Sequence, residues 1–308
     1  MIDLQVSLPL GLCLKNPVIA ASGTFGFGPE YASYVDLDRL GGISVKGVSA
    51  KPWRGNPPPR VWETPGGLLN SIGLQNPGMD AFIEEDIPFL SRVNTAVIAN
   101  IIGHTVEEYR QVAERLHREP RVDAFEVNIS CPNIKAGGMS FGHDPEQARQ
   151  VVQAVRSATD KPVMVKVSPN MAEPWTIAEA VVDAGADMIS AINTVVGMAI
   201  DLKARRPALG GVTGGLSGPA VKPIAVRIIY EIASRVGVPI IGMGGIQSAE
   251  DVLEFLMAGA SAVMVGTITF QHPERMTEII GDLPTVLARY GFSSLDEAVG
   301  AALDRKGA

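Results

Sequence analysis

Short runs of apolar, often β-branched residues recur along the whole chain. Each run is followed by a polar or glycine-rich turn and then by a helical pattern. Within a run the apolar residues are nearly continuous, which is typical of parallel strands covered on both faces. The pattern predicts strands at Pro17–Ala21, Gly42–Lys46, Ala96–Asn100, Val122–Asn128, Pro162–Val167, Asp187–Ile192, Pro239–Gly242 and Ala262–Val265.

Helix-start signals lie between these runs. Thr105 with Glu108 has the spacing of a capping box, and so does Ser248 with Asp251. Asp144 precedes a proline at a first helical position. Regular alternation of strand and helix favours an α/β fold, a (β/α)8 or TIM barrel, over an open doubly wound sheet. The open sheet stays possible, because a hydrophobic pattern does not prove that a sheet closes.

Two segments exceed a minimal barrel. Residues Val6 to Leu14 alternate around a Pro-Leu-Gly turn, which predicts a β-hairpin that could close the bottom of the barrel. Residues Lys51 to Gly78 form a long loop after the second strand, and long loops in compact domains are usually lids or binding loops. No repeat or linker composition marks a second domain, so residues 1–308 are expected to form one domain.

Composition narrows the function. The net charge of -7 argues against nucleic acid as a main partner. Cys13 and Cys131 are the only cysteines, too few for a disulfide framework or for the four ligands of an iron–sulfur cluster. The first residues lack a basic segment, and no apolar run reaches about 18 residues. We therefore expect a cytoplasmic protein without a membrane span.

In barrel enzymes the site lies at the carboxyl ends of the strands. Those ends carry amides, hydroxyls and two lysines, which suit a flat, hydrogen-bonding, anionic ligand. Any one of these residues could simply end a strand, but the whole set favours a binding site. The residues are Ser22, Lys46, Asn100, Asn128, Lys166, Asn193 and Thr194.

Glycine-rich turns follow the last two predicted strands, where barrels often bind phosphate. Gly244-Gly245 and Gly266-Thr267 would let backbone N–H groups approach phosphate oxygens, and the helix after Ser248 would direct its positive end at the same anion. The alternative is that these are only tight turns. No dinucleotide or P-loop motif occurs. No metal is predicted, because no ligand spacing with carboxylates is found at His104, His117, His143 or His272.

Cys131 lies in the run Asn128-Ile-Ser-Cys-Pro-Asn133, directly after a predicted strand. A thiol between two amides at the end of a strand is typical of an active-site edge. The alternative is a small buried apolar residue, which is the commoner role of a free cysteine.

Several motifs in order resemble class 1 dihydroorotate dehydrogenase. They are the Asn128–Asn133 run, Lys46-Gly47, Asn70-Ser-Ile-Gly-Leu-Gln-Asn76, Ile192-Asn193-Thr194, Gly215-Leu-Ser-Gly218 and the two final glycine turns. The match runs nearly end to end. It implies an FMN-containing barrel that oxidises dihydroorotate to orotate in pyrimidine synthesis. In that family the cysteine matching Cys131 is the base, whereas membrane-associated class 2 enzymes use serine.

The resemblance also implies a role for each site residue. Cys131 would take the C5 proton, Lys46 would lie between substrate and flavin, and Lys166 would stabilise charge on reduced FMN. Substrate would contact Lys46, Asn70, Ser71, Ile72, Gly73, Leu74, Asn128, Asn133, Asn193 and Thr194. FMN would contact Ser22, Lys46, Gly47, Asn100, Asn128, Lys166, Ile192, Gly218, Gly244, Gly245, Gly266 and Thr267.

Within class 1, Asn133-Ile-Lys-Ala-Gly-Gly138 and Asn193-Thr194 resemble the NAD-linked subclass 1B more than the fumarate-linked subclass 1A. Subclass 1B implies a homodimeric core that forms a heterotetramer with an iron–sulfur flavoprotein subunit, which carries FAD and a [2Fe–2S] cluster. The alternatives are subclass 1A, the flavin half of a dihydropyrimidine dehydrogenase, a flavin-free phosphate-binding isomerase, and a barrel without catalytic activity.

Overall fold

Parallel strands form a closed barrel in this computed structural model, which describes residues 2–130 and 141–303. Within these residues the barrel has eight strands, in the order β10-β15-β16-β3-β4-β7-β8-β9. Each strand overlaps a predicted run, so the (β/α)8 barrel is confirmed and the open sheet is wrong. The strands are β3 Val18–Ala20, β4 Gly42–Ser44, β7 Ala96–Ile101, β8 Ala124–Asn128, β9 Val163–Val167, β10 Met188–Ala191, β15 Ile240–Met243 and β16 Ala262–Val265.

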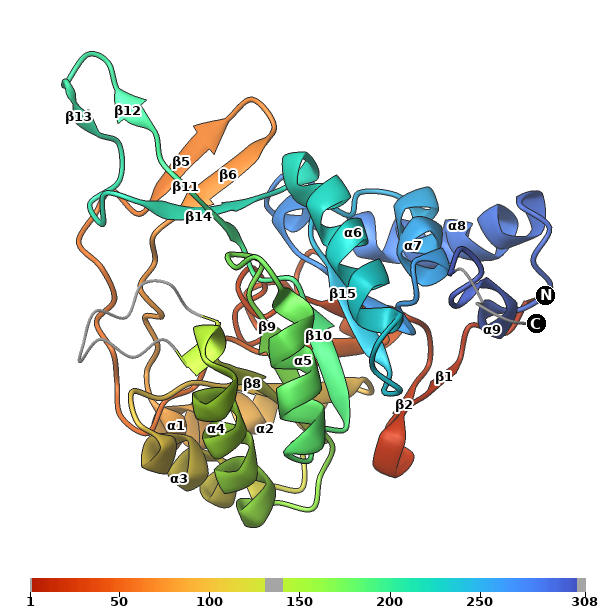
Figure 1. Ribbon diagram of the computed structural model, residues 1–308, viewed down its shortest axis with the longest axis horizontal. Helices are drawn as coiled ribbons and strands as arrows, with labels where there is room; N and C mark the ends of the chain where they lie inside the picture. The colour runs from red at the N-terminus through yellow and green to blue at the C-terminus, as the bar shows by residue number, and fades with distance from the viewer. Residues whose placement is uncertain (1, 131–140, 304–308) are drawn as a thin grey trace.

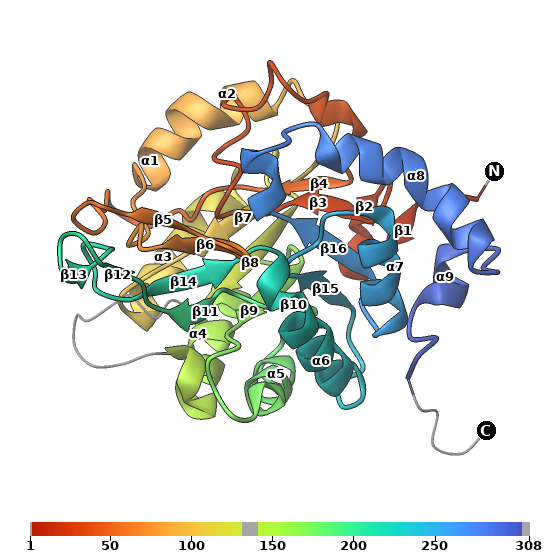
Figure 2. The same ribbon diagram turned by 90° about the horizontal axis from the view of Figure 1, so that it is seen from above.

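Helices surround the barrel on its outer face (Figures 1 and 2). Their buried sides carry the apolar residues, and these pack against the strands in one continuous core. The longer helices are α3 Val106–His117, α4 Pro145–Ala158, α5 Pro174–Asp183, α6 Lys222–Ala233, α7 Ala249–Met257 and α8 Arg275–Arg289. Short helical segments are α1 Met79–Ala81, the π-helical turn Phe82–Asp86, α2 Ile87–Leu90 and α9 Leu295–Ala298.

The predicted helix starts are present. The Thr105 hydroxyl accepts the N–H of Glu108 at the start of α3, and Asp144 accepts two N–H groups at the start of α4. Ser248 and Asp251 form a complete capping box at the start of α7. These contacts satisfy N–H groups that have no partner within the helix.

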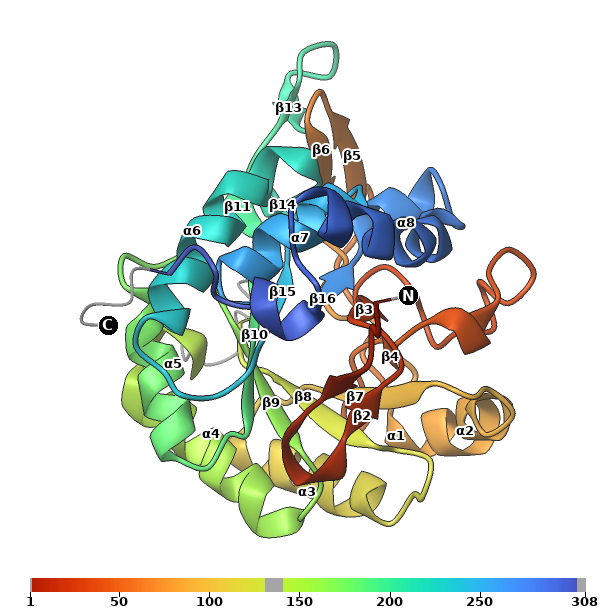
Figure 3. The same cartoon turned by 90° about the vertical axis from the view of Figure 1, so that its right-hand side faces the viewer.

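The N-terminal hairpin is also confirmed. Strands β1 (Val6–Ser7) and β2 (Cys13–Leu14) pair antiparallel around the predicted turn. Leu8, Leu12 and Leu14 are buried in the core. Figure 3 shows the hairpin at the end of the barrel that lies away from β5 and β6, so it covers the bottom of the barrel.

The long segment after the second barrel strand contains more regular structure than its composition indicates. Strands β5 (Val61–Thr64) and β6 (Gly67–Asn70) form a hairpin inside it. With β14 (Gly214–Ser217) and β11 (Val195–Gly197) they make an antiparallel sheet in the order β11-β14-β6-β5, and a small hairpin of β12 (Ile200–Asp201) and β13 (Arg206–Pro207) projects beyond it. The sheet stands beside the carboxyl ends of the barrel strands (Figure 1).

Candidate active site

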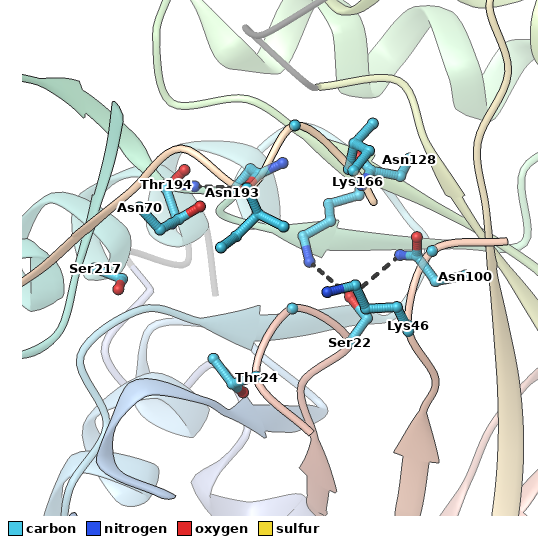
Figure 4. A pocket seen from close by; sticks show the side chains of 15 residues that line it. Ser22, Thr24, Lys46, Asn70, Asn100, Asn128, Lys166, Asn193, Thr194 and Ser217 are labelled. Atoms are coloured by element: carbon cyan, nitrogen blue, oxygen red, sulfur yellow. Dashed lines mark hydrogen bonds between the residues drawn. The ribbon is translucent and has the colours of Figure 1, made fainter. Parts of the chain in front are cut away.

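The carboxyl ends of the barrel strands and the β6–β14 pair enclose a first cavity, which we call the inner cavity (Figure 4). It combines amides, hydroxyls, lysines and bare backbone in one place. Its walls are formed by Ser22, Gly23, Thr24, Lys46, Gly47, Asn70, Ile72, Gly73, Leu74, Asn100, Asn128, Lys166, Asn193, Thr194 and Ser217.

Two further cavities continue from the inner cavity. The middle cavity shares Gly23, Thr24, Lys166, Asn193, Thr194 and Ser217 with it and adds apolar walls from Ile192, Leu216, Val221, Met243 and Met264. The outer cavity shares Gly218, Gly245, Gly266 and Thr267 with the middle cavity. Because neighbouring cavities share walls, they form one elongated cleft that is polar at the inner end, apolar in the middle and glycine-lined at the outer end.

Almost all of the predicted site residues line this cleft. Gly244 lines the middle cavity together with its sequence neighbours Met243 and Gly245. Ser71 is fully buried, and its hydroxyl accepts a hydrogen bond from Asn56 Nδ2 at 2.9 Å, so it supports the wall instead of lining it. Cys131 and Asn133 lie outside the residues that the structure describes.

Hydrogen bonds fix the amides at one side of the inner cavity. Ser130 Oγ donates to Asn128 Oδ1 at 3.1 Å and accepts from Asn193 Nδ2 at 2.7 Å. Asn193 Oδ1 in turn accepts the backbone N–H of Thr194 at 2.7 Å. Ser130 was not among the predicted site residues, although it stands between Asn128 and Cys131 in the sequence. These bonds hold two amide side chains in one orientation, which prepares them to bind a polar ring.

Other parts of the inner-cavity wall come from segments that the sequence separates widely. Asn70 lies at the end of β6, and its Nδ2 donates to the carbonyl of Gly215 on β14 at 3.2 Å. Lys46 is half-buried just beyond β4. Burial lowers the pKa of Lys46 below its ordinary value, while the charge of Glu30 opposes this and the charge of Arg60 adds to it. The cavity therefore holds a lysine with weakened solvation.

A buried carboxylate, Glu126 on β8, lies beneath the inner cavity. Its Oε1 is 3.6 Å from Lys166 Nζ, and its Oε2 accepts from Asn100 Nδ2 at 2.5 Å. Burial alone would raise the pKa of Glu126, but the Lys166 charge and the hydrogen bonds from Asn100, Ser44 and Ser190 outweigh it and lower the pKa. Glu126 is not among the predicted site residues. The signal was present, since an acid inside an apolar strand needs a partner.

Glycines shape the junction of the middle and outer cavities. Gly218 and Gly245 have φ values of +99° and +82°, which residues with side chains rarely adopt. A Cβ on Gly245 would stand 2.8 Å from the Gly218 carbonyl oxygen and 2.9 Å from the Lys222 Cβ. Only glycine therefore keeps this part of the wall in place.

At the start of α7, part of the positive end of the helix is bound within the chain. Asp251 Oδ2 accepts the N–H of Gln247 at 2.8 Å and that of Ser248 at 3.1 Å. Lys222 Nζ donates to Asp251 Oδ1 at 2.6 Å. The capping carboxylate thus binds the N–H groups of Gln247 and Ser248, and the turns Gly244-Gly245 and Gly266-Thr267 stay the candidates for phosphate.

The fold and the cleft together define a class, namely a (β/α)8 barrel with an elongated cleft, lined by amides, two lysines and glycines, at the carboxyl ends of its strands. The sequence model of the family described as dihydroorotate dehydrogenase matches residues 4–287. The chain therefore belongs to the dihydroorotate dehydrogenase family and is an oxidoreductase.

Curated relatives cover nearly the whole chain. One from Geotalea uraniireducens is 54% identical over 301 residues, 98% of this chain and 98% of the relative. One from Pelobacter propionicus is 55% identical over 299 residues (97% and 98%), and one from Bacillus pumilus is 54% identical over 297 residues (96% of each). All three are named dihydroorotate dehydrogenase B (NAD+), catalytic subunit.

Within residues 2–130 and 141–303, no helix is long and apolar enough to cross a membrane.

Proposed function

We propose that this chain oxidises dihydroorotate to orotate in pyrimidine biosynthesis and is the catalytic subunit of an NAD-linked enzyme. The observation that carries the proposal is the convergence of Asn70, Asn128, Asn193 and Thr194 on one cavity that also contains Lys46 and Lys166. This set of amide, hydroxyl and cationic groups matches a small ring with several carbonyls, ring N–H groups and a carboxylate. The names of the full-length relatives support the same activity.

The cleft fits FMN, which is a flat ring with one polar edge joined to a phosphate through a flexible chain. Lys166 would face the polar edge, apolar walls such as Ile192 and Met243 would cover the ring, and the glycine-lined outer cavity would hold the phosphate. Bound FMN supplies the acceptor for the hydride that leaves C6 of the substrate. The residues proposed to bind it are Ser22, Lys46, Gly47, Asn100, Asn128, Lys166, Ile192, Gly218, Gly244, Gly245, Gly266 and Thr267.

The chain's own residues would perform the proton transfer and the positioning. Cys131, as its thiolate, is proposed to accept the proton from C5, which leaves the C5–C6 double bond of orotate once the hydride has gone from C6. The amides of Asn128 and Asn193, already held by Ser130, would bind the substrate ring without reorganising. Lys166 would stabilise the negative charge that the reaction places beside it.

We propose that a second subunit continues the electron path. The relatives are named catalytic subunits and NAD-linked, which supports a companion chain. That companion would carry FAD and a [2Fe–2S] cluster and would join a homodimer of this chain in a heterotetramer. We further propose that residues 1–308 form a single FMN-binding domain and that the enzyme works in the cytoplasm.

The first experiment mixes the purified, FMN-loaded chain with dihydroorotate and follows the loss of flavin absorbance. We expect rapid bleaching with dihydroorotate and none with dihydrouracil, which lacks the carboxylate. Reoxidation should be poor with NAD and with fumarate until the companion subunit is added. Absence of bleaching by dihydroorotate would refute the proposed activity, and fast reoxidation by fumarate alone would refute the NAD-linked assignment.

Cys131→Ala tests the proposed base. We expect near-complete loss of flavin reduction with FMN still bound, because the variant removes only the group that accepts the C5 proton. Cys13→Ala is the matched control, since Cys13 is an exposed thiol on the N-terminal hairpin. Full activity of Cys131→Ala would contradict the assignment.

A further inference from the structure

Glu126 is completely buried inside the barrel, two residues before Asn128 on β8. Alternate residues of a strand share a face, so Glu126 points into the barrel on the same side as Asn128 but one layer deeper. Its carboxylate receives hydrogen bonds from three other barrel strands. Ser44 Oγ of β4 and Asn100 Nδ2 of β7 donate to Oε2 at 2.8 and 2.5 Å, and Ser190 Oγ of β10 donates to Oε1 at 2.8 Å.

Lys166 of β9 completes this arrangement. Its Nζ lies 3.6 Å from Glu126 Oε1, and the Lys166 side chain is only 8% exposed. The same Nζ reaches Ser22 Oγ at 3.5 Å, and Figure 4 shows Lys166 and Asn100 converging on Ser22. Both Lys166 and Asn100 line the inner cavity, so two of the partners of the buried carboxylate are cavity groups.

The stability of the fold does not by itself explain a buried carboxylate paired with a lysine. A buried ion pair contributes about as much as well-packed apolar residues, and often less. What an apolar residue could not do is hold an ammonium and an amide in place at the same time. Asn100 Nδ2 donates to Glu126 Oε2 and to Ser22 Oγ, which turns its Oδ1 toward Gly47.

We propose that Glu126 is a positioning residue that keeps Lys166 charged and aimed at the junction of the inner and middle cavities. This rests on the proposed function only in identifying the ligand at that junction as the flavin. Glu126 would touch neither substrate nor flavin, and would act through Lys166 and Asn100. An ammonium that is buried without a counter-ion loses its proton more readily than one that is paired.

Few other charges in the described part of the chain bear on this pair. Lys46 is the other charged side chain lining the inner cavity, and its charged neighbours are Glu30 and Arg60. Lys166 supplies the charge that acts on Glu126. If substitution of Glu126 changes the pH dependence of the site, we therefore expect the change to act through Lys166.

The test is Glu126→Gln, which keeps the size of the side chain and removes its charge. The absorption spectrum of bound, oxidised FMN is titrated with pH, together with the pH dependence of flavin reduction by dihydroorotate. We expect stoichiometric FMN in the variant. The alkaline change in the spectrum and the alkaline fall in rate should both move to lower pH by at least about one unit.

Two further variants make the test decisive. Glu126→Asp retains the charge one methylene farther from Lys166, so its shift should have the same direction and be smaller, and it replaces the Gln variant if that variant does not fold. Glu119→Gln removes the acid of the partly buried Arg115–Glu119 ion pair on the outside of the barrel, and its alkaline behaviour should equal that of wild type.

The spectral titration needs no substrate. A wild type that binds FMN but is not bleached by dihydroorotate would therefore refute the proposed activity and leave the role of Glu126 testable. Alkaline behaviour like wild type in Glu126→Gln, or in Glu126→Asp where that replaces it, would overturn the inference and reduce Glu126 to a structural residue.

Discussion

Asp86 gives the chain a pH-dependent stability that one substitution should remove. It ends the π-helical turn Phe82–Asp86, on the outer side of the barrel. Burial, helped by the negative charges of Glu30 and Glu85, raises the pKa of Asp86 from its ordinary 3.8 to about 6. Asp86→Asn keeps the size of the side chain and stays neutral at every pH.

The sign follows from the direction of the shift. Because the pKa of Asp86 is higher in the folded state, folding favours the protonated carboxyl. The stabilisation of the fold by the protonated Asp86 carboxyl is complete below about pH 4 and is lost as pH rises through about 6. A difference of about two pKa units corresponds to at most about 3 kcal/mol. The half-exposed position of Asp86 is screened by water, so we expect about 1 kcal/mol.

The assay is urea unfolding followed by circular dichroism, at about pH 4 and about pH 8, with saturating FMN in every sample. Asp86→Asn should gain about 1 kcal/mol of unfolding free energy over wild type at the higher pH and most of that gain should disappear at the lower pH. Asp282→Asn, an exposed aspartate of α8, should show no such dependence. A difference between Asp86→Asn and wild type that stays constant with pH would refute the reasoning.

Two other substitutions test the cleft. Gly245→Ala should lower the unfolding free energy by about 1–2 kcal/mol from its positive φ alone. It should also weaken FMN binding at least about tenfold, measured by flavin fluorescence, because the new Cβ meets the Gly218 carbonyl. The control is Gly281→Ala on α8, which should not destabilise the fold because nothing lies within 4 Å of the added Cβ. Lys166→Met should cost about 3–5 kcal/mol near neutral pH by leaving Glu126 unpaired, and Lys166→Met/Glu126→Gln should recover most of it. A Lys166→Met variant as stable as wild type would contradict this prediction for the buried ion pair.

Local sequence information was enough for the barrel itself. Each apolar run that was predicted as a strand overlaps a barrel strand, because a strand that is covered on both faces needs continuous apolar residues. The helix starts at Asp144 and Ser248 followed from side chains that cap the next few N–H groups. Most of the proposed cleft residues could also be found, since the carboxyl ends of parallel strands meet at one end of a barrel.

Contacts between distant segments could not be read from the sequence. Asn70 meets Gly215 across 145 positions, and this pairing gives regular structure to a segment that looked like a loop. Glu126 meets Ser44 across 82 positions and Ser190 across 64, so its apolar surroundings gave no sign of three hydrogen-bond donors. The amino-acid sequence thus determined which elements form and which residues lie at their ends, because periodicity and capping act within a few residues. Only the tertiary structure decided that the cleft is continuous and that a buried carboxylate lies beneath its lysine, because barrel closure is what brings those strands together.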